Sequence, residues 1–305
     1  MPHIPVLSYE SIKLLHIRPG SVVVDGTVGS GGHACMLAEA LDYRGVLFCI
    51  DRDPQALVRA EASLAASGAT GYRSLSIRFV HASYREARDI LRDAGVLHAD
   101  AMILDLGFSS DTLARGRGFS FQPASYREPL DMRYDLGEAC PTAADILRRS
   151  DERTIATILS TYGEERFAAR IARAIVQTRT RAPLVIVGDL VATVVRAIPP
   201  AARRGSLHAA TRTFQALRIA VNRELDHLEA FLADMPNVLA PDGTAAVISF
   251  HSLEDRAVKR AFRELTKSGA GTVSTPKPVG PSEAEVRRNP RSRSAKLRVF
   301  QRSPL

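Results

Sequence analysis

Short apolar runs alternate with helix-like patterns through the first third of the chain. The apolar runs lie at residues 22–24, 46–50, 75–80 and 99–104. Helical patterns lie before and between them, at 8–15, 35–41, 54–66 and 84–91. Strands that alternate with helices in this way predict a parallel, doubly wound sheet. Asp53 and Pro54 begin the third of these helices as its N-cap and first residue.

The alternation stops at about residue 113, and the sheet pattern resumes after residue 207. Helical patterns fill the interval, at 142–149, 151–162, 164–178 and 188–198, with one short candidate strand at 184–187. Beyond it we expect one helix over 210–235, a turn at 241–243, a strand at 244–249, a helix at 253–265, a loop over 268–285 and a strand at 295–301. The sequence therefore predicts a discontinuous core, 1–113 with 208–305, and a helical insertion domain over 114–207.

A glycine-rich loop follows the first predicted strand. Glycines stand at positions 26, 29, 31 and 32, directly before the next helix. Glycine permits positive φ and the close approach of a ligand, and the helix directs free N–H groups at the loop. Gly29, Gly31 and Ala34 also fit the pattern of dinucleotide-binding folds, a weak signal by itself. The alternative is a tight turn that binds nothing.

Polar residues stand at the carboxyl ends of the predicted strands. Asp51 ends the second strand, roughly 20 residues past the loop, where an acid holds the ribose of an adenosine cofactor. Asp25 precedes the loop, as is typical of S-adenosylmethionine enzymes, in which that acid lies near the cationic amino-acid end of the cofactor. Tyr84 either faces the adenine or is a surface residue, and Asp105 ends the fourth strand. Because these ends meet at one edge of a parallel sheet, they predict an adenosine-cofactor site, and Asp25 favours methyl transfer.

Composition and charge narrow the class of protein further. The 305 residues carry a net charge of +8 and a pI of about 9.7. This charge indicates a nucleic-acid partner, or else the arginine-rich composition reflects a GC-rich genome. No apolar run approaches the roughly 20 residues that span a bilayer, and residues 1–10 do not resemble a signal peptide, so we expect a cytoplasmic protein. Cys35, Cys49 and Cys140 lack the spacing of a metal cluster, and we expect no metal.

Several further motifs follow one another along the chain. They are residues 3–7, Asp25-Gly26-Thr27 with Gly31-Gly32-His33, Asp51-Arg52-Asp53-Pro54, Asp105-Leu106-Gly107 with 109–110, Arg117-Gly118-Phe119-Ser120-Phe121, 129–133, 162–167, 210–215, 248–256 and 289–294. In these motifs the chain resembles the bacterial 16S rRNA (cytosine-N4)-methyltransferases of the RsmH (MraW) type. The resemblance covers nearly the whole chain in the family's order and is highly specific.

The resemblance implies a class I, Rossmann-like methyltransferase core with a helical insertion domain that recognises substrate. It implies methyl transfer from S-adenosylmethionine to the exocyclic N4 of a cytidine in the decoding region of 16S rRNA. The cofactor contacts carried over to this sequence are Gly31, Gly32, His33, Asp51, Tyr84, Asp105 and Thr112. Tyr84 stands where the family often has Phe, Thr112 stands where Gln or His is common, and residues 123–127 lengthen the loop before Pro129.

The cytosine amine is a poor nucleophile because its lone pair is delocalised into the ring. We expect Asp105 to hold this amine in line with the cofactor, with His251 as either a proton relay or a structural residue. The target base must leave its stack, and Phe108, Phe119 or Phe121 either stacks on it or packs in the protein. Arg212, Arg291 and Arg293 are candidates to contact the RNA.

Other classes remain open on the sequence alone. A nicotinamide dehydrogenase would not need Asp25 or the arginine-rich tail, and a small-molecule methyltransferase would not need a strong salt dependence. A non-catalytic RNA-binding module would need neither the glycine loop nor Asp51. We expect 16S rRNA as the partner, within the small ribosomal subunit, and neither DNA nor membrane. We also expect a monomer or a weak homodimer.

Overall fold

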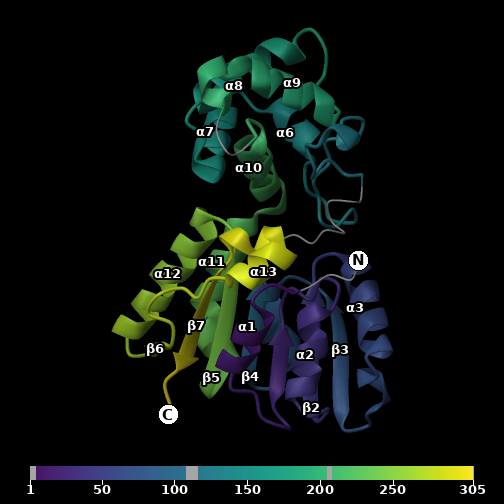
Figure 1. Cartoon of the computed structure of the whole chain (residues 1–305), viewed down its shortest axis with the longest axis vertical. Coiled ribbons are helices and arrows are strands. Elements are labelled where there is room, and N and C mark those ends of the chain that lie inside the picture. Colours follow the sequence, from purple (N-terminus) through teal and green to yellow (C-terminus); the bar gives the residue numbers. More distant parts are fainter. Residues whose placement is uncertain (1–4, 108–115, 205–207, 305) are drawn as a thin grey trace. The chain divides into compact units, whose positions relative to one another are not determined.

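The computed structural model describes residues 5–107, 116–204 and 208–304. The chain divides into two compact units, one of Met1–Ser109 with Leu225–Leu305 and the other of Ser110–Glu224 (Figure 1). The second unit extends past the predicted end at residue 207, because α10 (Thr211–Asn222) packs against α7 (Glu152–Gly163). Of the described residues, none lies in a helix that is both long and apolar enough to cross a membrane.

The first unit is built on a seven-stranded sheet with the order β3-β2-β1-β4-β5-β7-β6. Its strands are β1 (Val22–Asp25), β2 (Gly45–Asp51), β3 (Leu75–His81), β4 (Ala99–Asp105), β5 (Leu239–Ser249), β6 (Gly271–Val273) and β7 (Lys296–Arg302). Strands β1 to β5 run parallel to one another, while β7 is antiparallel to both β5 and β6. This is the expected Rossmann-like α/β fold, with an antiparallel pair at one edge.

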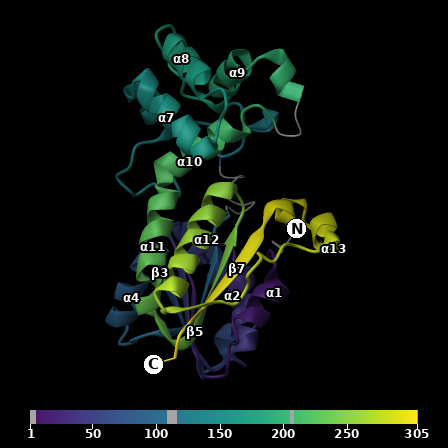
Figure 2. The same ribbon diagram turned by 90° about the vertical axis from the view of Figure 1, so that its left-hand side faces the viewer.

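Both faces of the sheet are covered by helices, which explains why its strands are apolar throughout. Val23 packs with α2 and α3 in one core, whereas the next residue, Val24, packs with α4, α11 and α12 in another. Figure 2 shows α2 on one side of the sheet and α4, α11 and α12 on the other. The α-helices of this unit are α1 (Ser8–Leu14), α2 (Gly32–Ala40), α3 (Pro54–Ala66), α4 (Ala87–Asp93), α11 (Glu224–Val238), α12 (Ser252–Lys267) and α13 (Glu283–Arg288). Asp53 caps α3 as expected, since its side chain accepts the Gln55 N–H.

The second unit is helical and has its own hydrophobic core. Its helices besides α7 and α10 are α6 (Ala143–Arg149), α8 (Ala168–Arg179) and α9 (Val187–Ala197). The strand expected at 184–187 is reduced to an isolated bridge between Ile186 and Pro129. Short 3₁₀ turns complete the chain, at η1 (Ala69–Gly71), η2 (Tyr84–Glu86), η3 (Pro123–Ser125), η4 (Pro200–Arg204) and η5 (Pro290–Ser294).

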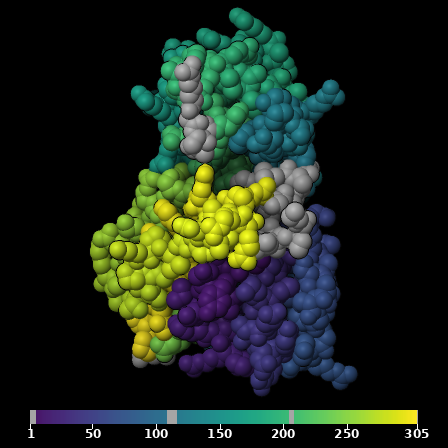
Figure 3. Space-filling model, viewed as in Figure 1, coloured from purple at the N-terminus to yellow at the C-terminus, as the bar shows by residue number. Residues whose placement is uncertain are grey.

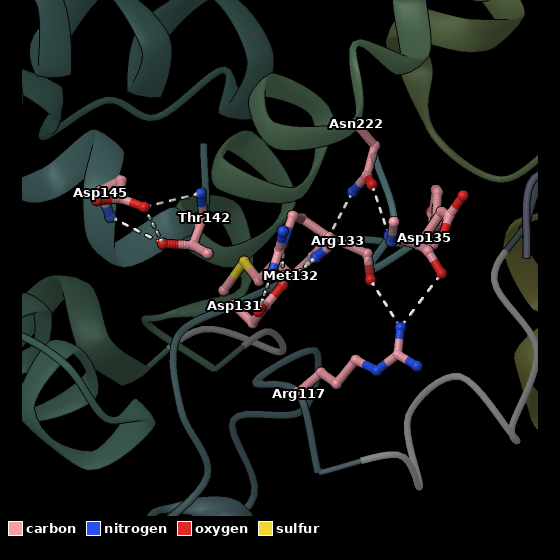
Figure 4. A network of polar contacts seen from close by, with 10 residues as sticks. Arg117, Asp131, Met132, Arg133, Asp135, Thr142, Asp145 and Asn222 are labelled. Atoms are coloured by element: carbon pink, nitrogen blue, oxygen red, sulfur yellow. Dashed lines mark hydrogen bonds and ion pairs between the residues drawn. The ribbon is translucent and has the colours of Figure 1, made fainter. Parts of the chain in front are cut away.

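The single helix expected over 210–235 is wrong. The backbone leaves the helical region at Arg223, whose φ is 51°, so α10 ends at Asn222 and α11 begins at Glu224. Asn222 also bonds outside its helix, because its side-chain amide donates to the Met132 carbonyl at 2.7 Å and accepts the Tyr134 N–H at 2.9 Å (Figure 4). The apolar stripe continues across the break, and so the sequence pattern did not reveal it.

Two loop expectations near the C-terminus are also corrected. Strand β5 begins at Leu239, so the turn expected at 241–243 lies inside it as an irregularity, where Asp242 has a φ of 62°. The pairing of β5 with β4 shifts register at this point. The loop expected over 268–285 contains β6 and the start of α13.

Candidate cofactor site

Three carboxylates meet at one edge of the sheet. Asp25, Asp51 and Asp105 end the adjacent strands β1, β2 and β4. Burial, and after it the charges of Asp105 and Asp51, raise the pKa of Asp25 to about 8. The expected convergence of these acids is therefore present in the first unit.

The glycine loop is tied to Asp51. The N–H of Gly29 donates to one carboxylate oxygen of Asp51 at 2.9 Å, and the N–H of Asp53 donates to the other at 2.9 Å. Gly31 has a φ of 86°, and a Cβ on it would lie 2.9 Å from the Cα of Ala60 in α3. A side chain at position 31 would therefore push the loop away from α3. A carboxylate held in a fixed position by two backbone N–H groups is a suitable acceptor for a ribose hydroxyl.

Asp25 has a buried side-chain oxygen to which a ligand could donate a hydrogen bond. Its side chain is 1 % exposed, and Oδ1 accepts the Thr27 N–H at 3.2 Å. Oδ2 is buried and has no hydrogen-bond partner among the described residues. An unpaired polar atom in a buried place costs stability unless a ligand completes it. A cationic amino group fits here, since it would replace the proton that Asp25 otherwise keeps and would neutralise the resulting carboxylate.

Asp105 presents a second such oxygen. Burial raises the pKa of Asp105 to about 7, and the charge of Glu254 adds to the effect. Its Oδ1 is buried and has no hydrogen-bond partner in the described part of the chain. The backbone around it is fixed, because the Asp105 N–H donates to Thr27 Oγ1 at 2.7 Å and the Leu106 N–H donates to the Ile248 carbonyl at 3.0 Å. Sequence reasoning did not assign a role to Thr27, although it belongs to the motif that follows Asp25.

His33, expected at the cofactor, has its ring inside the protein. The residue is 6 % exposed, its Nε2 lies 3.1 Å from the Val6 carbonyl, and its Nδ1 lies 3.7 Å from Oδ2 of Asp105. Gly31 is the N-cap of α2 and Gly32 its first residue, so their backbone remains next to the loop. A cofactor contact by these residues stays a prediction.

Tyr84 begins η2 just after β3 and is half-buried. Its ring lies edge-on to Phe231, with 5.7 Å between the ring centroids. A Cβ on Gly26 would come within 3.0 Å of the Tyr84 Cβ and 2.3 Å of Leu104 Cδ2, so the loop and η2 approach closely. The contact of Tyr84 with adenine stays a prediction.

His251 has a structural role in this fold. It is the N-cap of α12, and its Nδ1 accepts the Glu254 N–H at 3.4 Å. Its Nε2 lies 3.1 Å from Oε1 of Glu254, and the other carboxylate oxygen accepts the Phe250 N–H at 2.8 Å. Of the two roles weighed for His251, this capping box supports the structural one.

Two of the aromatic candidates for stacking on RNA, Phe119 and Phe121, are packed in the second unit. Phe119 is 6 % exposed and stacks on Tyr134, with 5.6 Å between centroids, so its ring is part of the core. Phe121 is half-buried between His208 and Phe214, at 5.2 and 5.4 Å. Phe108 and Thr112 lie outside the described residues.

The loop that packs against Phe119 is held by a polar network (Figure 4). Arg117 donates to the carbonyls of Arg133 and Tyr134, at 3.3 and 3.2 Å. The Asp131 carboxylate accepts hydrogen bonds from both Nε and Nη2 of Arg133, at 2.9 and 2.8 Å. The Arg117 and Arg133 side chains therefore have structural partners here.

The basic candidates are exposed. Arg212 donates to the Glu164 carbonyl at 2.6 Å and leaves the rest of its side chain at the surface. Arg291 and Arg293 stand on η5, directly before β7. Because Lys296 of β7 pairs with Ser249 at the carboxyl end of β5, η5 lies at the same edge of the sheet as the three acids. Figure 3 shows this segment in yellow at the surface, beside the purple N-terminal residues.

A Rossmann-like sheet with a glycine loop, a ribose-type acid and a buried carboxylate for a cationic group defines the core of a methyltransferase. The chain belongs to the MraW methylase family, whose model matches residues 1–303. It is thus a methyltransferase that uses S-adenosylmethionine, and a nicotinamide dehydrogenase is set aside.

Curated relatives match along nearly their full length. "Ribosomal RNA small subunit methyltransferase H" of Anaeromyxobacter sp. (strain K) is 44% identical over 317 residues, which cover 98% of this chain and 97% of the relative. The protein of the same name from Synechococcus sp. (strain JA-2-3B'a(2-13)) is 47% identical over 304 residues, covering 99% and 92%.

The raised pKa of Asp25 predicts a specific pH dependence of stability. The folded protein keeps the Asp25 proton up to about pH 8, whereas the unfolded chain loses it near pH 4. The wild-type free energy of unfolding should therefore fall as pH rises from about 4 to 8. Asp25→Asn removes this titration, so its stability relative to wild type should rise over that range and level off above it.

Urea unfolding at several pH values measures this difference. Asp93→Asn, an exposed change at the end of α4, is the control and should keep the wild-type pH dependence. A difference between Asp25→Asn and wild type that does not vary with pH would contradict the assignment.

Proposed function

We propose that this chain transfers the methyl group of S-adenosylmethionine to the exocyclic N4 of a cytidine in the decoding region of 16S rRNA. Membership of the MraW methylase family and relatives named as ribosomal RNA small subunit methyltransferases make it an rRNA methyltransferase, and they disfavour a small-molecule acceptor. The observation that carries the proposed site is the pair of buried carboxyl oxygens, on Asp25 and Asp105, at neighbouring strand ends.

The residues of the first unit fit the cofactor. Asp51 would accept hydrogen bonds from the ribose hydroxyls while the N–H groups of Gly29 and Asp53 hold its carboxylate in place. Asp25 would neutralise the amino group of the methionine end, since its buried Oδ2 needs a donor. When bound, the cofactor supplies an electrophilic methyl group on a sulfonium.

Asp105 would act on the acceptor amine. A carboxylate oxygen that accepts a hydrogen bond from N4 increases electron density on that nitrogen and fixes its direction. Because Thr27 and Ile248 hold the backbone of residues 105 and 106, the carboxylate is presented without reorganisation. Positioning of this kind lowers barriers by several kcal/mol, up to about 7–11 in the best cases.

The RNA must deliver an unstacked cytidine to this edge. We propose the second unit, with Arg212 on its surface, as a substrate-recognition domain, and the small ribosomal subunit in the cytoplasm as the context of the reaction. Arg291 and Arg293 on η5 would hold phosphates near the target base, since they are exposed at the edge that carries the acids. A monomer suffices for this chemistry, because the acids come from one chain.

Removing the two η5 arginines should weaken RNA binding and flatten its salt dependence. Each lost phosphate contact lowers the slope of log K against log salt by roughly 0.7–0.9, so Arg291→Ala with Arg293→Ala should lower it by about 1.5. Filter binding of 16S rRNA at several salt concentrations measures the slope.

The matched control is Arg260→Ala with Arg263→Ala, which removes the same charge from the exposed face of α12. Equal slopes for the two double variants would mean that only net charge matters, and η5 would lose its role.

Expression in a bacterium that lacks its own enzyme of this kind tests the proposed function. Nucleosides from purified 16S rRNA are analysed by mass spectrometry. N4-methylcytidine that appears with the wild-type chain and is absent with Asp51→Ala supports the proposal. A methylated nucleoside other than N4-methylcytidine, or no methylation from a chain that binds the cofactor, would contradict it.

A further inference from the structure

The surroundings of His33 determine which ring nitrogen carries hydrogen. Nε2 lies 3.1 Å from the backbone carbonyl of Val6, and the ring is 7 % exposed. A carbonyl oxygen only accepts hydrogen bonds, so Nε2 must carry a hydrogen to make this contact. In the neutral imidazole, Nδ1 is then left with a lone pair.

That lone pair faces a carboxylate. Nδ1 lies 3.7 Å from Oδ2 of Asp105, whose side chain is 16 % exposed. Two lone-pair-bearing atoms at this distance repel each other in a place with little water, whereas one proton on either atom converts the contact into an attraction. The pair is therefore most stable when it holds one proton in addition to the hydrogen on Nε2.

The charges around the pair favour that proton. Asp25 at the end of β1 interacts with Asp105, and Glu254 of α12 raises the Asp105 pKa. Asp51 ends β2 at the same edge, and Glu285 of α13 accepts the N–H of Leu7, next to the carbonyl that binds His33. Asp51, Glu254 and Glu285 are acidic, and Asp25 joins them once it loses its proton near pH 8, so these groups disfavour a pair that carries a net negative charge.

We propose that His33 and Asp105 form one proton-sharing pair, and that the form of this pair without the shared proton takes up the proton that the substrate amine releases on methylation. The proposal rests on the proposed function. Asp105 is the catalytic residue, because the proposed function places it in contact with the amine, and His33 is a positioning residue that acts through Asp105. It also gives His33 a role beyond the expected cofactor contact.

Methyl transfer to N4 replaces a sulfur–carbon bond with a nitrogen–carbon bond. The N4 lone pair forms the new N–C bond, and the S–C bond of the sulfonium breaks with its electron pair left on sulfur. One N4–H bond then breaks, and its proton passes to Asp105 and is shared with Nδ1 of His33. The pair returns the proton to water after the product leaves.

Nitrogen-15 NMR of histidine-labelled, ligand-free protein tests the pair without any methylation. The chain has eight histidines, and the signals of His33 are identified as the ones that are absent from the spectrum of His33→Gln. We expect the Nε2–H tautomer at high pH, and a titration midpoint that falls in Asp105→Asn because the carboxylate that stabilises the imidazolium is gone. An Nδ1–H tautomer, or a midpoint that Asp105→Asn leaves in place, would overturn the proposal even if the enzyme methylates rRNA.

The pH profile of kcat is the second readout. In His33→Gln the introduced side-chain amide can still donate to the Val6 carbonyl but offers no second base, so Asp105 titrates alone. Two coupled sites can share the last proton, so the pair loses it at a pH equal to or higher than the pKa of the Asp105 carboxyl group alone. The acid limb of the profile should therefore move to lower pH in His33→Gln, with a lower plateau.

A reduced kcat with an unmoved acid limb would leave His33 a purely structural residue and overturn its role in the pair. Wild-type enzyme that methylates no RNA, together with the expected NMR result, would count against the proposed function and leave the shared proton established.

Discussion

Asp51→Ala is expected to weaken binding of S-adenosylmethionine by roughly 10²–10⁴-fold. Two hydrogen bonds from ribose hydroxyls to a carboxylate contribute about 1.5–3 kcal/mol each, and each 1.4 kcal/mol is a factor of about ten. The variant also releases the N–H groups of Gly29 and Asp53, so the loop loses the group that fixes it. Isothermal titration of the purified protein with the cofactor measures the dissociation constant.

The neighbouring acid provides the control for that experiment. Asp53 caps α3 and pairs with Arg59 at 3.2 Å, so Asp53→Ala removes a buried carboxylate two residues away without touching the proposed ribose contact. It should cost about 1 kcal/mol of stability and little affinity. Equal losses of affinity in the two variants would show that Asp51 acts only by holding the fold.

Asp105→Asn is expected to lower kcat by roughly 10²–10⁴-fold, the usual contribution of a positioned acid–base group. Asparagine has nearly the shape of aspartate and still accepts hydrogen bonds, but it does not take up the proton of the amine. Affinity for the cofactor should change much less. Asp25 and Asp51 keep their proposed contacts, and the introduced amide still accepts hydrogen bonds where the resemblance places a cofactor contact of Asp105. Single-turnover methylation of rRNA, with cofactor binding measured separately, distinguishes the two quantities. Full turnover by a folded Asp105→Asn variant would remove Asp105 from the reaction.

The edge of the sheet was predictable from the sequence for a simple reason. Apolar runs that end in an acid or a glycine mark the carboxyl ends of strands, and parallel connections bring those ends together. Asp25, Asp51 and Asp105 therefore could be placed at one edge before any coordinates. The loop glycines were expected to permit positive φ and the close approach of a ligand. Gly31 does have a φ of 86°, but the close approach that the structure shows there is to Ala60 of α3.

Other features depend on contacts between residues far apart in the chain. His33 contacts Asp105 and Val6 only after α2, β4 and the N-terminal segment have packed together. The residues around His33 in the sequence do not indicate these contacts. Phe119 belongs to a core formed with Tyr134 and helices up to about 100 residues away, so its burial was not readable from its own motif. Arg223 adopts a left-handed backbone inside a continuous apolar stripe, and the polar contacts of Asn222 that accompany this break come from a distant loop.

The most direct test of the account is transfer of labelled methyl from S-adenosylmethionine to small ribosomal subunits from cells that lack this activity. Naked 16S rRNA is assayed in parallel, and Asp51→Ala serves as the control. We predict label in N4-methylcytidine from the subunits, more than from naked rRNA, and its loss in the control. Absence of label from both RNAs, with protein that still binds the cofactor, would contradict the account and direct attention to a different acceptor.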